Sequence, residues 1–516
     1  MRLGKANTSV QGSSSSSPSG IRNSINPFHI PEIVFEIGRY LDNSALARCS
    51  RVCREWNRTF IPFLYSAIEI TTKPSTFPSI GALRNNEASI RSISFMTNKL
   101  YNIHSHLVMP NLKTLTMRLA CSCSNMEPMV RNHKSIRFLE LSDIPTEHRT
   151  LMLKTIAGLP HIEELTLRKQ HIARISALWD VFSRLKKLSL ISIYFEFMGS
   201  NTTATLPLHP DFDMLRDLTI TGWGSDVAFE AALIAKCPNL ECLEWEVDRR
   251  DMDARLIPHV QGFIQGLVRG KWANLKSLSI RHQFVQDAVF EEIIQALDNR
   301  MLEELDVSKT QFGEQAFGAL RHYFSTLRIV NIRNCPNLNS ANVMELLTLC
   351  PHLQSLAVDR IYAQYLDTDQ IWPCNKTLQS LSIEFELDRE PNTSESSGAT
   401  ERTPEELNGV VFACLGQLRE LESLTVGYPK PVRYGQAYDQ ASIPLEIQLT
   451  KGLGALAGLK RLNSFSMGDL TGSLGPKEVD WMIGNWPQLG VLEGLSKTTK
   501  KIPRQRVAKR NGIKVK

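Results

Sequence analysis

The chain has 516 residues, of which 42% are hydrophobic and 22% are charged, as in an ordinary globular protein. Nowhere do about eighteen apolar residues run together, so the sequence argues against a membrane-spanning helix. The formal net charge is +6, but nine Lys and Arg and no acid lie in residues 497–516, so the rest of the chain carries −3.

The N-terminal segment, residues 1–25, is rich in Ser and has no apolar run of the kind that directs secretion. Such a composition favours disorder, because it offers too little apolar surface for burial. We expect the protein to lie inside the cell, in the cytoplasm, the nucleus or both. Its ten cysteines are then expected to be reduced.

Residues 26–70 carry two apolar stripes at helical spacing. The first stripe comprises Ile30, Ile33, Val34, Ile37 and Leu41. Pro31 lies in the first turn of this expected helix, where proline is tolerated. The polar run "DNS" at 42–44 ends this helix and offers a cap for the next one. The second stripe comprises Leu46, Cys49, Val52, Cys53 and Trp56, which predicts that both cysteines are buried as small hydrophobic residues.

Neither zinc nor nucleic acid explains this segment. A zinc site needs about four clustered ligands, and Cys49 and Cys53 have no second pair nearby. Acids of the same segment nearly balance its outward-facing arginines, which are Arg48, Arg51, Arg54 and Arg58. We therefore expect no metal and no nucleic acid here.

Between residues 88 and 495 one pattern recurs fifteen times: an aliphatic residue, two others, an aliphatic, one other, an aliphatic. Examples are "NLKTLTM" from Asn111, "NLKSLSI" from Asn274 and "TLQSLSI" from Thr377. The last two aliphatics alternate with polar residues, which predicts a short strand with one buried face. Intervening stretches such as "SANVMELLTLCPHL" predict helices. One strand buries too little to be stable alone, so the units must stack into a solenoid.

The predicted solenoid is irregular. Three residues after the last aliphatic, one copy has Cys335 where others have Gln170, Ile193 or Thr310, so a ladder of buried hydrogen bonds would be patchy. Residues 384–410 hold eight acids against two bases and predict an insertion loop, either a flexible linker or a phosphorylated regulatory segment. Residues 427–444 predict a second, Pro- and Tyr-rich loop. The basic tail, residues 497–516, is expected to be disordered or to act as a nuclear-localisation patch.

Motifs of the common catalytic classes are missing from the sequence. It has no Gly-x-x-x-x-Gly-Lys-Ser/Thr loop, no His-Glu-x-x-His and no Gly-x-Ser-x-Gly elbow. The cysteines that precede prolines in "CPNL" and "CPHL" are interpreted as core residues. We expect a binding protein that needs no cofactor and is not an enzyme.

Two family resemblances follow from these residues. The stretches "IPEIVFEIGRYL" and "LARCSRVCREWNRTF" resemble an F-box, although the usual spacer between Pro31 and Glu32 is missing. The repeats resemble leucine-rich repeats of the cysteine-containing subtype. Together they imply an α/β fold with a short three-helix F-box at 26–70, followed by a horseshoe-shaped solenoid at 71–496.

In F-box/leucine-rich-repeat proteins, the F-box binds a Skp-type adaptor of a cullin–RING ubiquitin ligase. The resemblance implies adaptor contacts at Pro31, Glu32, Ile33, Leu46, Val52 and Trp56. Alternatively, some of these residues hold the three helices together. A second hypothesis is a scaffold outside any ligase, in which the helices cap the solenoid. A third, regulation of a small GTPase, has no supporting signature.

The concave strand face of the solenoid would hold a target protein. Residues between and after the strand aliphatics would line it, and the charged ones are Arg118, Arg168, Glu244, Glu246, Arg281, Asp306, Arg333 and Asp359. Their mixed charges predict a polar protein surface and no single ligand class. They are equally compatible with ordinary solvated strand positions.

Overall fold

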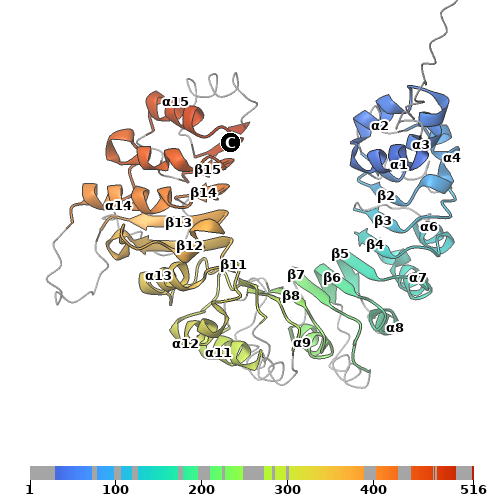
Figure 1. The fold of residues 1–516 in the computed structure, drawn as a ribbon. Helices are drawn as coiled ribbons and strands as arrows, with labels where there is room; N and C mark the ends of the chain where they lie inside the picture. Colours follow the sequence, from blue (N-terminus) through green and yellow to red (C-terminus); the bar gives the residue numbers. More distant parts are fainter. Residues whose placement is uncertain are drawn as a thin grey trace, which may run out of the picture.

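The computed structural model describes residues 30–71, 78–97, 106–118, 126–172, 178–195, 210–222, 227–247, 272–281, 285–297, 301–388, 402–427, 443–468, 470, 474–494 and 514–515. Their elements form an open arc, with strands along its inner side and helices along its outer side (Figure 1). The predicted disordered segment 1–25 lies outside the described residues, as do most of the loop at 427–444 and most of the tail.

The inner side of the arc is one sheet of seventeen strands, counted over the described residues. Each strand pairs in parallel with the next one along the chain. The strands are β1 Ala67–Ile70, β2 Ser92–Phe95, β3 Thr114–Met117, β4 Phe138–Ser142, β5 Glu164–Ile172, β6 Lys187–Phe195, β7 Asp217–Gly222, β8 Cys242–Val247, β9 Ser277–Arg281, β10 Glu304–Asp306, β11 Ile329–Asn331, β12 Ser355–Tyr362, β13 Ser380–Glu386, β14 Ser423–Thr425, β15 Ser464–Ser466, β16 Val491–Glu493 and β17 Lys514–Val515.

Helices return the chain from one strand to the next along the outer side. The α-helices of the solenoid are α4 Ile80–Arg84, α6 Met126–Asn132, α7 Thr146–Ala157, α8 Trp179–Phe182, α9 Val227–Ala235, α11 Asp287–Ala296, α12 Glu314–Leu320, α13 Ser340–Leu349, α14 Pro404–Gly416 and α15 Pro476–Asn485. Short 3₁₀ turns add η3 Glu87–Ser89, η8 Arg321–Tyr323, η9 Ala363–Tyr365, η10 Pro373–Lys376, η11 Leu449–Lys451 and η12 Leu453–Gly458. The predicted α/β repeat solenoid is therefore confirmed.

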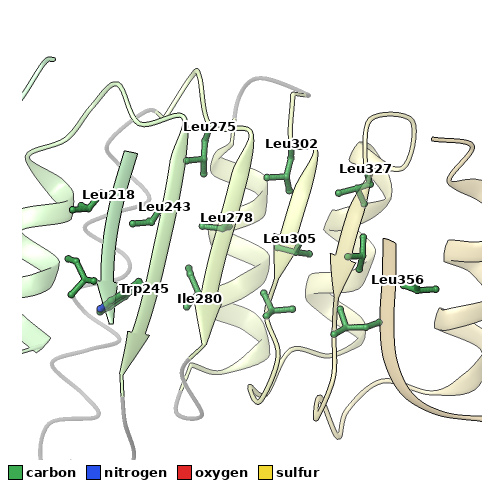
Figure 2. Packing of buried hydrophobic residues seen from close by; sticks show 14 of the residues in the cluster. Leu218, Leu243, Trp245, Leu275, Leu278, Ile280, Leu302, Leu305, Leu327 and Leu356 are labelled. Atoms are coloured by element: carbon green, nitrogen blue, oxygen red, sulfur yellow. The ribbon is translucent and has the colours of Figure 1, made fainter. Parts of the chain in front are cut away.

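The repeated aliphatics explain why the strands stack. Leu243, Leu278 and Leu305 lie in register on consecutive strands, and all three are buried (Figure 2). Burying one such side chain contributes roughly 1.5–3 kcal/mol, too little to order an isolated strand of a few residues. The core is consequently continuous from one repeat to the next, as expected of a solenoid.

The ladder of buried polar residues is indeed patchy. Gln170 is buried, accepts from the backbone N–H of Ile144 at 3.1 Å and donates to the carbonyl of Arg168 at 2.8 Å. Thr310 and Cys335 occupy this place in two later repeats, and both donate to the carbonyl of Val307, at 2.6 and 3.1 Å. These side chains satisfy backbone groups that would otherwise be buried without a partner.

Three helices precede the solenoid: α1 Pro31–Tyr40, α2 Asn43–Cys49 and α3 Arg54–Leu64. They enclose a small core of Val34, Leu46 and Phe60, which is separate from the core of the solenoid. The last residues of the expected 26–70 segment form β1, which pairs with β2 as the first strand of the sheet.

Two further boundaries differ from the sequence expectation. The loop expected at 384–410 is shorter, since β13 continues to Glu386 and α14 begins at Pro404, where Thr403 and Glu406 form a capping box. In the tail, Lys514 and Val515 pair with β16 rather than being disordered. No helix among the described residues is long and apolar enough to cross a membrane.

Candidate functional site

Helix α1 has two apolar faces. Its inner face packs on α3 through Gly38, where an added Cβ would lie 2.9 Å from the Phe63 ring and 3.2 Å from the Phe60 ring. Its outer face carries Ile33, Ile37 and Tyr40, with Ile33 39% and Tyr40 87% exposed. Helical spacing of three and four residues places these side chains on one stripe. A helix that only needed to pack on α3 would not require this second stripe.

The outer stripe borders a shallow, open hollow lined by Glu32, Ile33, Glu36, Ile37 and Tyr40. We call these five residues the α1 outer face. Its two carboxylates lie beside the apolar side chains, and Glu36 forms an exposed ion pair of 3.2 Å with Arg39. An apolar strip with acidic neighbours is suited to contact with another protein.

The turn between α2 and α3 adds a second exposed apolar residue, Val52, which is 64% exposed. The prediction that the second apolar stripe runs along one helix is wrong, because helix α2 ends at Cys49 and helix α3 begins only at Arg54. Cys53 is exposed, and its Sγ accepts from the backbone N–H of Trp56 at 3.4 Å as the cap of α3. The predicted cap from the "DNS" run is confirmed, since Asp42 accepts from the N–H of Ala45 at 2.7 Å.

On the concave face, polar residues stand in register between the core aliphatics. Thr116, Glu140 and Thr166 are neighbours on β3, β4 and β5, and Glu244 and Ser279 are neighbours on β8 and β9. Several positions of this column carry small hydroxyl side chains, and the charged Glu140 among them is buried. The arrangement groups the charges into separate clusters.

Three charged clusters follow the strands. Glu140 binds Arg118, with Nε–Oε1 3.1 Å and Nη2–Oε2 3.3 Å, and Arg168, with Nε–Oε1 2.8 Å. Farther along the arc, Arg281 pairs with both Glu244 and Glu246. The third cluster combines Arg360 of β12 with two glutamates of β13, Glu384 at 3.8 Å and Glu386 at 2.6 Å.

An ion-pair ladder runs along the edge where the chain enters the strands. Glu163 lies between Arg137 at 3.2 Å and Lys186 at 2.9 Å, and its hydrogen bond from Lys186 lowers the pKa of the carboxyl. Glu241 lies likewise between Arg216 and Lys276, at 3.8 and 3.0 Å. These pairs are exposed, so each stabilises the fold only weakly, and each of the two glutamates is shared by two basic side chains.

The buried cysteines have no features of nucleophiles. Burial raises the pKa of the Cys335 and Cys350 thiols to about 12, and it also raises the pKa of Cys237. A protonated thiol in the core is a packing residue. The prediction that the cysteines of the "CPNL" and "CPHL" motifs belong to the core is confirmed. Nowhere in the described ranges do three or more His, Cys, Asp or Glu side chains gather as metal ligands.

Comparison with known proteins identifies the three-helix segment. Residues 31–70 match the family model described as F-box-like. The chain joins this F-box-like domain to a parallel-strand solenoid that resembles leucine-rich repeats. No curated protein sequence matches this chain.

Many solved structures are similar to this chain, and the following two align with most of it. A leucine-rich-repeat protein of Leptospira interrogans aligns with 85% of this chain and 99% of its own, at 15% identity and a TM-score of 0.33. A complex of Rad7 and Elc1 from yeast aligns with 94% of this chain and 92% of its own, at 12% identity and a TM-score of 0.35. The assignment of a repeat solenoid rests on the observed alternation of parallel strands and helices and not on these two alignments.

Within the F-box-like domain the predicted adaptor residues divide into two groups. Pro31, Glu32, Ile33 and Val52 are exposed and available to a partner. Leu46 is buried in the helical core and offers no surface, so its assignment as a contact is corrected to a packing role. Trp56 is half-buried, with its ring edge against Phe60 at 5.5 Å between centroids.

Sequence reasoning missed two exposed aromatic residues of α1, Phe35 and Tyr40. Tyr40 could have been found, because it lies seven residues after Ile33 and extends the same stripe. Phe35 packs on Phe63, with ring centroids 4.7 Å apart, and Arg39 lies over its ring. Tyr40 therefore gives the α1 outer face an aromatic side chain that the motif alone did not indicate.

The predicted concave-face residues are not one site. Arg118 and Arg168 meet at Glu140, which sequence reasoning did not name, and Glu244, Glu246 and Arg281 form the second cluster. The rest have local partners: Asp306 accepts from the N–H of Ser308 at 3.0 Å, Arg333 donates to Ser382, and Asp359 accepts from the N–H of Asn334.

Proposed function

We propose that the chain is the substrate-recognition subunit of a Skp–cullin–F-box ubiquitin ligase. The F-box-like domain would bind a Skp-type adaptor, and the concave face would hold the target protein. Catalysis would come from proximity, since a bound target lysine is presented to activated ubiquitin at high effective concentration. The chain itself would not be an enzyme. It would act inside the cell, in the cytoplasm, the nucleus or both.

The observation that carries the proposal is the exposed apolar surface of a domain with its own closed core. Val34, Leu46 and Phe60 already hold the three helices together, while Ile33 and Tyr40 remain exposed. Exposed apolar side chains of this size, gathered on one helix, are typical of protein-interaction surfaces. Glu32 and Glu36 on the same face would favour an adaptor groove with basic residues at its rim.

The alternative, a scaffold whose helices only cap the solenoid, accounts for fewer of these observations. A cap would direct its apolar face toward the first repeat and share its core. Here the two cores are separate, and the second apolar stripe of α1 borders an open hollow. We therefore favour the ligase subunit.

Co-expression with a Skp-type adaptor, followed by size-exclusion chromatography, tests the proposal. Ile33→Asp with Tyr40→Asp should abolish co-elution, because both charges would lie in the interface. Ile371→Asp is a matched control, since Ile371 is also an exposed aliphatic, at 67%, but lies in the solenoid. Circular dichroism should show that all variants are folded. Absence of co-elution for folded wild-type protein would favour the scaffold.

A further inference from the structure

The two ends of the sheet are covered in different ways. At the start of the arc the three helices of the F-box-like domain lie next to the first strands (Figure 1). At the other end the outermost strand is β17, which comprises only Lys514 and Val515. It covers β16, which would otherwise be the edge strand of the sheet. An uncovered edge presents unpaired backbone N–H and C=O groups that pair readily with another extended chain.

The contacts that hold β16 in place come from the inner side of the sheet. Leu492 of β16 lies in register with Phe465 of β15, and both side chains are buried. The ring of Phe465 packs on that of Trp486, with centroids 5.2 Å apart, and the indole N–H of Trp486 donates to the carbonyl of Leu456 at 3.0 Å. Removal of β17 would leave these contacts intact. β17 therefore adds backbone pairing to a strand that its own repeat already holds.

The pairing between β16 and β17 is short. Val491 lies opposite Lys514 and Leu492 opposite Val515, in parallel register. Parallel neighbours need a crossover connection of a dozen or more residues, and the nineteen residues of 495–513 supply it. Closing a connection of this length costs conformational entropy, and a strand of two residues forms few hydrogen bonds in return. β17 is consequently a weak occupant of the edge.

The segment that contains β17 shows which chemistry fits this edge. Residues 512–516 read "GIKVK", in which aliphatic and basic residues alternate. Such alternation is typical of a strand with one apolar and one solvated face. In the parallel register, the residue after Val515 in an added strand would lie opposite Glu493, the last residue of β16. A basic residue at that position has the complementary charge.

We propose that the outer edge of β16 is a docking site for an extended segment of a partner protein that alternates aliphatic and basic residues, and that β17 occupies this site in cis. The partner segment adds a parallel strand through backbone hydrogen bonds, and its alternate side chains supply the specificity. Only one strand can occupy the edge at a time, so β17 competes with the partner. Its covalent connection gives β17 a high effective concentration, which keeps the site closed until a better-fitting segment displaces it.

A fluorescent peptide with the sequence of residues 510–516, RNGIKVK, is the probe for this site, and fluorescence polarisation with the purified full chain measures its affinity. Lys514→Pro with Val515→Pro removes both N–H groups of β17 and should open the edge. This variant should bind the peptide about tenfold or more tightly than the wild type, in which β17 competes. Val507→Pro with Lys509→Pro is the matched control, because it makes the same two changes outside β17, and it should bind as weakly as the wild type.

The peptide RNGIPPK carries the same charges except one and cannot pair as a strand, so it should not bind the opened variant. Equal binding of the two peptides would overturn the proposal, because attraction by charge alone would then explain the affinity. Equal affinity of the opened variant and the wild type for RNGIKVK would also overturn it, provided that circular dichroism shows both to be folded. So would a dimer of the opened variant that excludes the peptide, since the edge would then serve a second copy of the chain. No adaptor is present, so this test is independent of the proposed ligase role.

Discussion

The carboxylate of Asp287 accepts a hydrogen bond from the backbone N–H of Gly313 at 2.8 Å, which ties the first residue of α11 to the start of α12 in the next repeat. The same carboxylate accepts from the N–H groups of Gln315 at 3.0 Å and Ala316 at 3.1 Å. One side chain therefore caps a helix of the neighbouring repeat. Such contacts transmit stability along a solenoid, where each repeat depends on its neighbours.

We predict that Asp287→Ala lowers the free energy of unfolding by about 1–3 kcal/mol, because three N–H groups lose a charged acceptor. Urea denaturation followed by circular dichroism would measure this change. Glu292→Ala, which removes an exposed acid from the same helix, should change stability by less than about 0.5 kcal/mol. Equal effects of the two substitutions would show that the cap contributes nothing.

We predict that the buried ring of His133 makes the free energy of unfolding depend on pH. The ring is buried, its Nε2 accepts from the N–H of Met109 at 3.0 Å, and its Nδ1 donates to the carbonyl of Met129 at 2.6 Å. Burial lowers the pKa of His133 below its ordinary value of 6.5, so the folded state favours the neutral ring. The unfolded chain binds this proton more readily. The stabilising contribution is thus complete above about pH 6.5 and is lost as the pH falls through the folded pKa.

Denaturation curves between pH 7.5 and 5 would measure this effect. His133→Ala should be less stable than wild type by about 1–3 kcal/mol at pH 7.5, because the Met109 N–H loses its acceptor. It should also lose less stability than wild type on acidification. The exposed His161 provides the control, and His161→Ala should keep the wild-type slope. A wild-type slope in His133→Ala would contradict the assignment.

A substitution at Gly38 tests whether the F-box-like domain unfolds independently of the solenoid. Gly38→Ala places a methyl group 2.9 Å from the Phe63 ring, which should destabilise the three-helix domain by about 1–3 kcal/mol. Because the two cores are separate, the solenoid should keep its own stability. Limited proteolysis should therefore release the N-terminal helices first and leave the repeats intact.

Gly318→Ala is the matched control, since Gly318 lies in α12 with no atom within 4 Å of an added Cβ. It should be neutral or stabilise by roughly 0.5–1 kcal/mol, because alanine favours a helix over glycine. Unfolding of the whole chain together in Gly38→Ala would show that the two cores are coupled.

The repeat pattern predicted the solenoid because its signal is periodic and recurs over hundreds of residues. Leu115 and Met117 are buried as the alternation requires, and the patchy ladder at Gln170 and Thr310 was visible in the sequence. The first strand, β1, was missed because its aliphatics follow the F-box directly without a full repeat before them. Its pairing with β2 depends on contacts that no local pattern records.

The clusters of the concave face were harder to predict, because side chains on neighbouring strands meet only when the register is known. Arg118 and Arg168 are fifty residues apart and were named separately, while Glu140 was overlooked. Alignment of the repeats would have placed Glu140 between Thr116 and Thr166. Cys53 was predicted to be buried but is exposed, for another reason. The spacing of apolar residues cannot show that the four residues after Cys49 form a turn between two helices.

The most direct test of the central claim is the affinity of the purified full chain for a Skp-type adaptor, measured by isothermal titration calorimetry. We predict one-to-one binding of the wild type and of Ile371→Asp with the same dissociation constant. We predict at least tenfold weaker binding of Ile33→Asp with Tyr40→Asp, since two charges in an apolar contact cost more than about 1.4 kcal/mol. Failure of folded wild-type protein to bind, or equal affinity of the α1 variant, would contradict the proposed adaptor-binding role of α1.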